Sequence, residues 1–186
     1  LDRYHSRPLD TRQESPWSLL HWAIAYGIDS QVTTGASVGE PMTAIEWLCC
    51  NGVSAGQRLI QVENGKLSLP IAPGLQGHHG QFLSMLAQSN VDPSHELRVS
   101  GFEYQVRDLV AHEKRTCESG MELTFKLIGI AHYTPSEEVW TNDRGESWNV
   151  RRLLVEELNQ PIDRMTCCCG GTHRLFAWAY AVERRR

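Results

Sequence analysis

The sequence lacks a hydrophobic run long enough to cross a membrane, and it has little net charge. Its best apolar stretch, residues 175–182, is far shorter than the roughly 18 to 20 residues that a membrane span requires. The 18 Lys and Arg residues nearly balance the 22 Asp and Glu residues, which leaves a formal charge of -4 at pH 7. A nucleic-acid groove needs a strongly basic surface. We therefore expect neither a membrane span nor a nucleic-acid partner, and we interpret the basic run 184–186 as solvated and frayed.

Cysteine is too scarce for a disulfide scaffold, and an initiator Met is missing. Three of the 6 cysteines are consecutive at 167–169, and neighbouring thiols rarely bridge one another. Long-range disulfides that involve this triplet or Cys49 and Cys50 remain open. The chain begins at Leu1, which predicts a processed or excerpted protein and an exported or periplasmic location.

The composition is that of a globular protein. Hydrophobic residues make up 41% of the chain and charged residues 22%, with only 8 prolines, and this length is enough to bury a real core. Residues 1–14 are polar and irregular, so the sequence predicts one domain over residues 15–186.

Hydrophobic periodicity predicts helices along most of this domain. Nearly all-apolar segments predict buried helices at 17–26, 79–89, 120–133 and 172–182. Segments with one polar face predict amphipathic helices at 40–51, 100–114 and 151–158. Ser15-Pro16 and Gly27 are typical helix-start and helix-stop residues, and Ser100 with Glu103 forms the pattern of a capping box.

A small β-hairpin interrupts this pattern at about residues 58–70. Asn64-Gly65 stands between two short apolar alternations, which is the strongest local signal for a hairpin turn. Apart from this insert we expect an all-α fold. The alternation of buried and amphipathic helices predicts a toroid-like array in which inner helices are covered by outer ones.

This pattern, with a glycine just before each inner helix, resembles the α/α toroid of terpenoid cyclases, protein prenyltransferase subunits, lanthionine-synthetase-like proteins and several glycan-processing enzymes. The segments Gly77-His78-His79-Gly80-Gln81 and Gly170-Gly171-Thr172-His173 also resemble those of uncharacterised bacterial proteins with a toroid-like pattern. The resemblance covers about residues 15–183. It implies an α/α-toroid fold but no particular reaction.

The chain departs from the toroid families at their functional motifs. It has no Asp-rich cyclase motif, no glutamine-tryptophan repeats and no Cys-His-Gly triplet, and the zinc ligands of prenyltransferases have no match. It also offers about three and a half helical hairpins where a closed toroid needs about six. We therefore expect an incomplete toroid, which missing N-terminal repeats or a homodimer would complete.

The aligned inner helices suggest a site. Their alignment puts Trp17, His79, Glu122 and His173 at one level, where parallel helix N-termini open on a common mouth and favour anions. We predict catalytic roles for His79, Glu122 and His173. The predicted ligand-binding residues are His78, Gln81, Trp17 and His21.

A zinc ion is the predicted cofactor of this site. Cys169 precedes His173 by four residues, so both side chains share a helical face if the helix extends back one turn. Cys169, His173 and His79 are legitimate zinc ligands, and a fourth position would hold water for catalysis. Two alternatives stay open: the histidines are capping or core residues, or Cys169 is a nucleophile paired with His173 or His79.

The sequence thus leaves two classes of function. The first is an enzyme, a metal-dependent hydrolase, lyase or transferase that acts on a small molecule, peptide or glycan. The second is a non-enzymatic helical-repeat module that binds a peptide, glycan or apolar ligand in the same pocket. A stoichiometric metal or a strongly shifted His or Glu pKa at the mouth would favour the enzyme.

Overall fold

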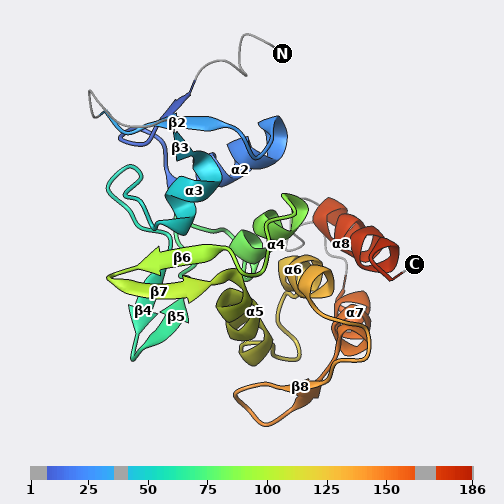
Figure 1. Ribbon diagram of the computed structural model, residues 1–186. Helices are drawn as coiled ribbons and strands as arrows, with labels where there is room; N and C mark the ends of the chain where they lie inside the picture. The colour runs from blue at the N-terminus through green and yellow to red at the C-terminus, as the bar shows by residue number, and fades with distance from the viewer. Residues whose placement is uncertain (1–7, 36–41, 162–170, 186) are drawn as a thin grey trace. The chain divides into compact units, whose positions relative to one another are not determined.

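The chain forms two units, each built from separate stretches of sequence. The computed structural model describes residues 8–35, 42–161 and 171–185 (Figure 1). Unit 1 consists of residues 1–77 and 88–106, and unit 2 consists of residues 78–87 and 107–186. Neither unit is a continuous piece of chain, so each depends on residues distant in sequence.

The described residues form helices and strands in a mixed α/β fold. The helices are α2 (Pro16–Tyr26), α3 (Ala44–Cys49), α4 (Gln81–Gln88), α5 (Val106–Arg115), α6 (Thr124–Tyr133), α7 (Val150–Asn159) and α8 (Thr172–Glu183). The strands are β1 (Leu9–Asp10), β2 (Gln31–Thr33), β3 (Met42–Thr43), β4 (Gln61–Glu63), β5 (Lys66–Ser68), β6 (Glu96–Val99), β7 (Phe102–Gln105), β8 (Trp140–Thr141) and β9 (Ser147–Trp148). The predicted all-α toroid is wrong, because these nine strands pair into four small sheets.

In unit 1, a three-stranded sheet lies beside α2 and α3. β2 is central, parallel to β1 and antiparallel to β3. β1 falls within the segment that the sequence assigned to irregular structure. The predicted second helix begins later than expected, because Met42 and Thr43 extend as β3 and the Thr43 side chain then caps α3 through a capping box with Glu46.

The first predicted helix is confirmed as α2. The Ser15 side chain accepts a hydrogen bond from the backbone N–H of Ser18, and Pro16 occupies the first helical turn. Leu19 and Leu20 are fully buried, whereas Trp17 remains 44% exposed. The helix therefore has a solvent face, which the nearly continuous apolar sequence did not predict.

The predicted hairpin is confirmed, and a second one replaces a predicted helix start. Asn64 and Gly65 have positive φ values of 51° and 74° in the turn between β4 and β5. Ser100 and Gly101 have φ values of 53° and 83° in the turn between β6 and β7. The predicted capping box at Ser100 is therefore wrong, because a two-residue turn with both φ angles positive joins two paired strands. The helix begins only at α5.

In unit 2, the central helices are buried as predicted. Residues 81–87 of α4 and 124–131 of α6 are buried on all sides. Helices α6, α7 and α8 lie side by side (Figure 1). The prediction of an all-buried last helix is wrong, because Leu175, Phe176 and Val182 of α8 are 61%, 44% and 47% exposed.

A short hairpin, β8–β9, closes against the end of α5. The side chain of Asn142 accepts hydrogen bonds from the backbone N–H groups of Arg144 and Glu146 and donates one to the Cys117 carbonyl. This side-chain bonding fixes the turn without a long strand on either side. Among the described residues, no helix is long and apolar enough to cross a membrane.

Candidate functional site

The first turn of α6 is held by a carboxylate from α7. Glu157 accepts a hydrogen bond from the Leu123 backbone N–H at 2.9 Å and another from the Thr124 hydroxyl at 2.7 Å. Leu123 provides no side-chain cap of its own. Because the first N–H groups of a helix have no partner within the helix, Glu157 supplies the cap from elsewhere in unit 2.

The same carboxylate also holds the start of α8. The Arg174 Nε lies 2.7 Å from the Glu157 Oε1, with side-chain exposures of 8% and 0%. Arg174 donates further hydrogen bonds to the carbonyls of Gln160 and Pro161. A buried ion pair is tolerated when its remaining donors and acceptors are satisfied, as they are here. Glu157 therefore fixes the first turns of α6 and α8 relative to each other.

The turn that precedes α4 packs closely against α6. Gly80 has a φ of +77°, and a Cβ at this position would lie 2.8 Å from the backbone nitrogen of Lys126. Only glycine permits both the left-handed conformation and this close approach. Lys126 itself is 1% exposed, and its Nζ lies 2.6 Å from the Glu113 carboxylate. The two histidines before Gly80 are thus anchored at the start of α6.

His78 and Glu122 form a hydrogen-bonded pair in this corner. The His78 Nδ1 lies 2.7 Å from the Glu122 Oε2, and the side chains are 29% and 35% exposed. A carboxylate only accepts hydrogen bonds, so Nδ1 donates the proton and the lone pair of the neutral ring is on Nε2. Carboxylate-oriented imidazoles of this kind serve as general bases in many enzymes.

The ring of Phe125 lies against both His78 and His173. Its centroid is 5.0 Å from the His78 ring, with an interplanar angle of 28°, and 5.2 Å from the His173 ring, at 52°. Phe125 is 6% exposed. The structure therefore brings His78 and His173 together around one aromatic ring, and Glu122 joins them through its hydrogen bond to His78. The three residues come from three stretches of unit 2. We call these three residues and Phe125 the His78 cluster.

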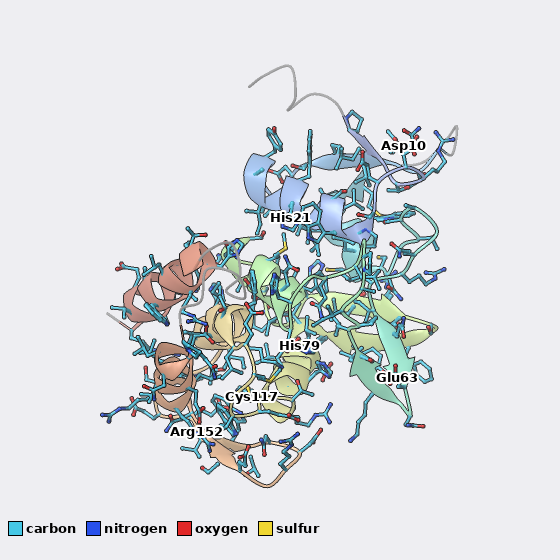
Figure 2. All side chains as sticks on the ribbon, turned by 180° about the vertical axis from the view of Figure 1, so that it is seen from behind. Asp10, His21, Glu63, His79, Cys117 and Arg152 are labelled. Atoms are coloured by element: carbon cyan, nitrogen blue, oxygen red, sulfur yellow. The ribbon has the colours of Figure 1, made fainter. Side chains whose placement is uncertain are left out.

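His79 follows His78 in the chain and lies just before α4 (Figure 2). Partial desolvation by the surrounding protein lowers the pKa of His79, and the positive charge of Lys126 adds to that effect. The carboxylates of Glu113, Glu122 and Glu118 oppose it. The net effect favours a neutral imidazole, which is the form that acts as a base.

The contacts that define the His78 cluster do not include the remaining predicted site residues. Trp17 and His21 belong to unit 1, where their rings stack 3.7 Å apart and the His21 Nδ1 lies 2.7 Å from the Trp17 carbonyl. Gln81 is 4% exposed at the start of α4. Cys169 lies outside the described residues. Within the described part of the chain, no group of three or more His, Cys, Asp or Glu side chains is arranged to hold a metal ion.

The described cysteines are free thiols. Burial raises the pKa values of Cys49 and Cys117 to about 12. A thiol reacts as its thiolate, so these two residues are inert at neutral pH. Cys50 is exposed. The predicted nucleophile Cys169 and its neighbours Cys167 and Cys168 fall among the residues that the structure does not describe.

Comparisons with protein-family models, with curated proteins and with solved structures found no match. The resemblance of the two glycine–histidine segments to bacterial toroid-like proteins therefore stays a prediction. The all-α fold that it implied is contradicted by the four small sheets. Function resides in the side chains of a site and does not follow from a fold alone.

Sequence reasoning missed the residues that support the cluster. These are Glu113, Lys126, Glu157 and Arg174. One signal was visible: Lys126 is a charged residue within an otherwise apolar helical segment, and such a residue requires a partner when it is buried. The identity of that partner, Glu113, depends on tertiary contacts that no local pattern specifies.

Proposed function

We propose that the His78 cluster binds a small-molecule substrate and acts on it by general acid–base catalysis, as a hydrolase, lyase or transferase. The main support is the 2.7 Å hydrogen bond between Glu122 and His78 Nδ1. This bond orients the imidazole and keeps its basic lone pair on Nε2. In this proposal His78 takes or returns a proton on the substrate, and Glu122 is its positioning residue.

The supporting framework agrees with such a role. The Glu157–Arg174 pair holds the helix starts that carry Glu122 and His173, and Gly80 holds the turn that carries His78. An imidazole held in one orientation needs little reorganisation when it transfers a proton. In this proposal His173 and His79 act as second proton donors or as groups that bind the substrate.

A zinc-dependent form of the same activity also remains a proposal. It rests on the sequence prediction that Cys169, His173 and His79 are ligands. The acid–base proposal depends on His78 and Glu122 and does not require those ligands.

The test uses the full chain with an activated ester, p-nitrophenyl acetate, as a generic substrate. Removal of a general base typically lowers the rate about 10²–10⁴-fold, so His78→Ala should lose most turnover. Glu122→Gln should lose less, since it weakens the orientation and keeps the base. His95→Ala, a change in unit 1, is the matched control and should turn over as the wild type does.

Three further outcomes separate the alternatives. Equal turnover in wild type and His78→Ala would refute the acid–base proposal. Loss of turnover in a chelator, restored by zinc, would favour the metal-dependent form. Binding of small molecules by ligand-observed NMR that His78→Ala abolishes, without turnover of any of them, would favour the non-enzymatic binding module.

A further inference from the structure

A groove between α7 and α8 in unit 2 has no role in the His78 cluster. Its volume is about 460 Å³. The apolar part of its lining comes from Val150, Leu154, Ala181 and Val182. Arg151 and Arg185 also line it. Pockets that bind small molecules have volumes of about 300–1,000 Å³ and combine apolar walls with a few polar groups, which is the character of this groove.

Arg185 is fixed in place, contrary to the expectation of a frayed basic end. Its Nη2 donates hydrogen bonds to the carbonyls of Ala131 and Thr134, at 3.1 and 2.8 Å. These carbonyls belong to the last turn of α6 and the residue after it, where carbonyl groups lack helical partners. The guanidinium group is therefore held against the end of α6 and does not move freely in solvent.

Arg185 has no direct ion-pair partner in the described part of the chain. No carboxylate there lies within ion-pair distance of Arg185 or of Arg151. The Nε of Arg185 is buried and has no hydrogen-bond partner among the described residues. Burial lowers the pKa of Arg185 and Arg184 adds to this, while Glu137 offsets it in part.

A part-buried cation beside an apolar wall has a defined chemical complement. An anion would satisfy the guanidinium group through charge-assisted hydrogen bonds, and a carboxylate matches its planar geometry. An aliphatic tail would cover Val182, which is now 47% exposed. Both features occur together in an amphiphilic acid.

We propose that the groove between α7 and α8 binds a small amphiphilic carboxylate, whose head group pairs with Arg185 and Arg151 and whose alkyl chain lies on Val150, Leu154, Ala181 and Val182. This site is separate from the His78 cluster. It does not depend on the proposed acid–base activity.

The test uses the full chain and octanoate below its micelle concentration, with binding measured by calorimetry and mapped by amide shifts in NMR. We expect saturable binding with shifts concentrated in α7 and the last turns of α8. Octanol, which has the same chain but no charge, should bind at least about tenfold more weakly, because a charge-assisted hydrogen bond is lost.

Two variants test separately the contributions of the head-group contact and of the apolar groove to octanoate binding. Arg185→Gln should weaken octanoate binding about tenfold or more, whereas Arg98→Gln, an exposed arginine of unit 1, should not change it. Because Arg185 also binds the end of α6, Arg185→Gln is checked for folding by circular dichroism. Val182→Trp, at a lining position that is 47% exposed, narrows the groove and keeps the arginines. It should abolish binding even if Arg185→Gln fails to fold.

Two results would overturn the proposal. One is the absence of saturable octanoate binding at millimolar concentration. The other is equal affinity for octanoate and octanol, which would indicate a purely apolar surface. His78→Ala should bind octanoate normally, so failure of this site and failure of the acid–base proposal are distinguishable.

Discussion

His132, in the last turn of α6, lies beside a cation and a phenol hydroxyl group. The Arg184 Nη2 lies 2.6 Å from its Nδ1, and the Tyr180 hydroxyl lies 2.7 Å from the same nitrogen. Burial, and then the positive charge of Arg184, lower the pKa of His132 to about 4. The folded protein therefore holds a neutral imidazole here under conditions in which an unfolded chain binds a proton.

This difference predicts a loss of stability in weak acid. The ordinary pKa of histidine is 6.5 and that of folded His132 is about 4, so between these values the unfolded state binds the extra proton. The free energy of unfolding should then fall as the pH falls through this window. In urea titrations from pH 7 to pH 4, His132→Gln should show a shallower decline than wild type.

A second variant distinguishes the two causes. Arg184→Gln removes the nearby charge but not the burial. The decline of its free energy of unfolding with falling pH should therefore lie between those of wild type and His132→Gln. His79 and His112 have pKa values lowered by burial as well, which is why some decline should persist in every variant. Identical slopes in all three proteins would contradict the assigned role of His132.

The candidate site was predictable only in part at the level of single residues. The sequence singled out His78, Glu122 and His173, and the structure places both histidines against Phe125 and Glu122 against His78. These residues could be identified because glycine-rich flanking segments and predicted helix starts are local features of the sequence. The buried pairs that hold them join residues far apart in the chain, such as Glu157 and Arg174, and a single sequence has no local mark of such contacts.

At the scale of elements, the sequence of the turn between β6 and β7 is compatible with two local structures. Serine followed by glycine fits a helix cap as well as a hairpin turn. The alternation of exposed Glu96 and Arg98 with buried Leu97 and Val99 was the signal for a strand. Helices α2, α4, α6 and α7 were predictable because each hydrophobic pattern extends over at least two helical turns. Strands of two to four residues are too short to show a recognisable alternation of apolar and polar residues.

The geometry of this turn predicts a stabilising change. Ser100 has a φ of 53°, and asparagine tolerates this left-handed region better than serine does. Ser100→Asn should therefore raise the free energy of unfolding by about 0.5 kcal/mol, within the range of single stabilising changes. The measurement is the midpoint of thermal or urea unfolding.

Gly101→Ala is the matched opposite change. Gly101 has a φ of +83°, and no neighbouring atom lies within 4 Å of the position that an alanine methyl group would occupy. The expected loss of about 1–2 kcal/mol is therefore purely conformational. A destabilising Ser100→Asn, or a neutral Gly101→Ala, would show that the turn does not adopt this conformation in solution.

At the scale of the whole molecule, unit 2 takes one of its buried helices from the middle of the sequence. Residues 78–87 belong to unit 2, while the residues on both sides of them belong to unit 1. Composition and periodicity predicted the helix itself but carry no information about which unit it joins. That assignment depends on close contacts such as Gly129 of α6 against Leu83 of α4.

A fragment of residues 107–186 should therefore not fold by itself. It lacks α4, whose residues 81–87 are all buried, and its absence would expose the apolar side chains of α6 to water. We expect weak helicity by circular dichroism and no cooperative thermal transition. Addition of a peptide of residues 78–88 should restore helicity, and a scrambled peptide should not. Cooperative unfolding of the fragment alone would contradict this expectation.

The cap that Glu157 provides for α6 has a consequence for the order of events during protein synthesis. His78 and Glu122 leave the ribosome well before Glu157, and Arg174 follows later still. Until then, the first turn of α6 lacks the carboxylate that it binds in the native chain. The nascent protein should thus hold its His78 cluster unassembled until α7 and the start of α8 have emerged, and ribosome-bound chains that end before Glu157 should be cut rapidly by proteases in the region of α6.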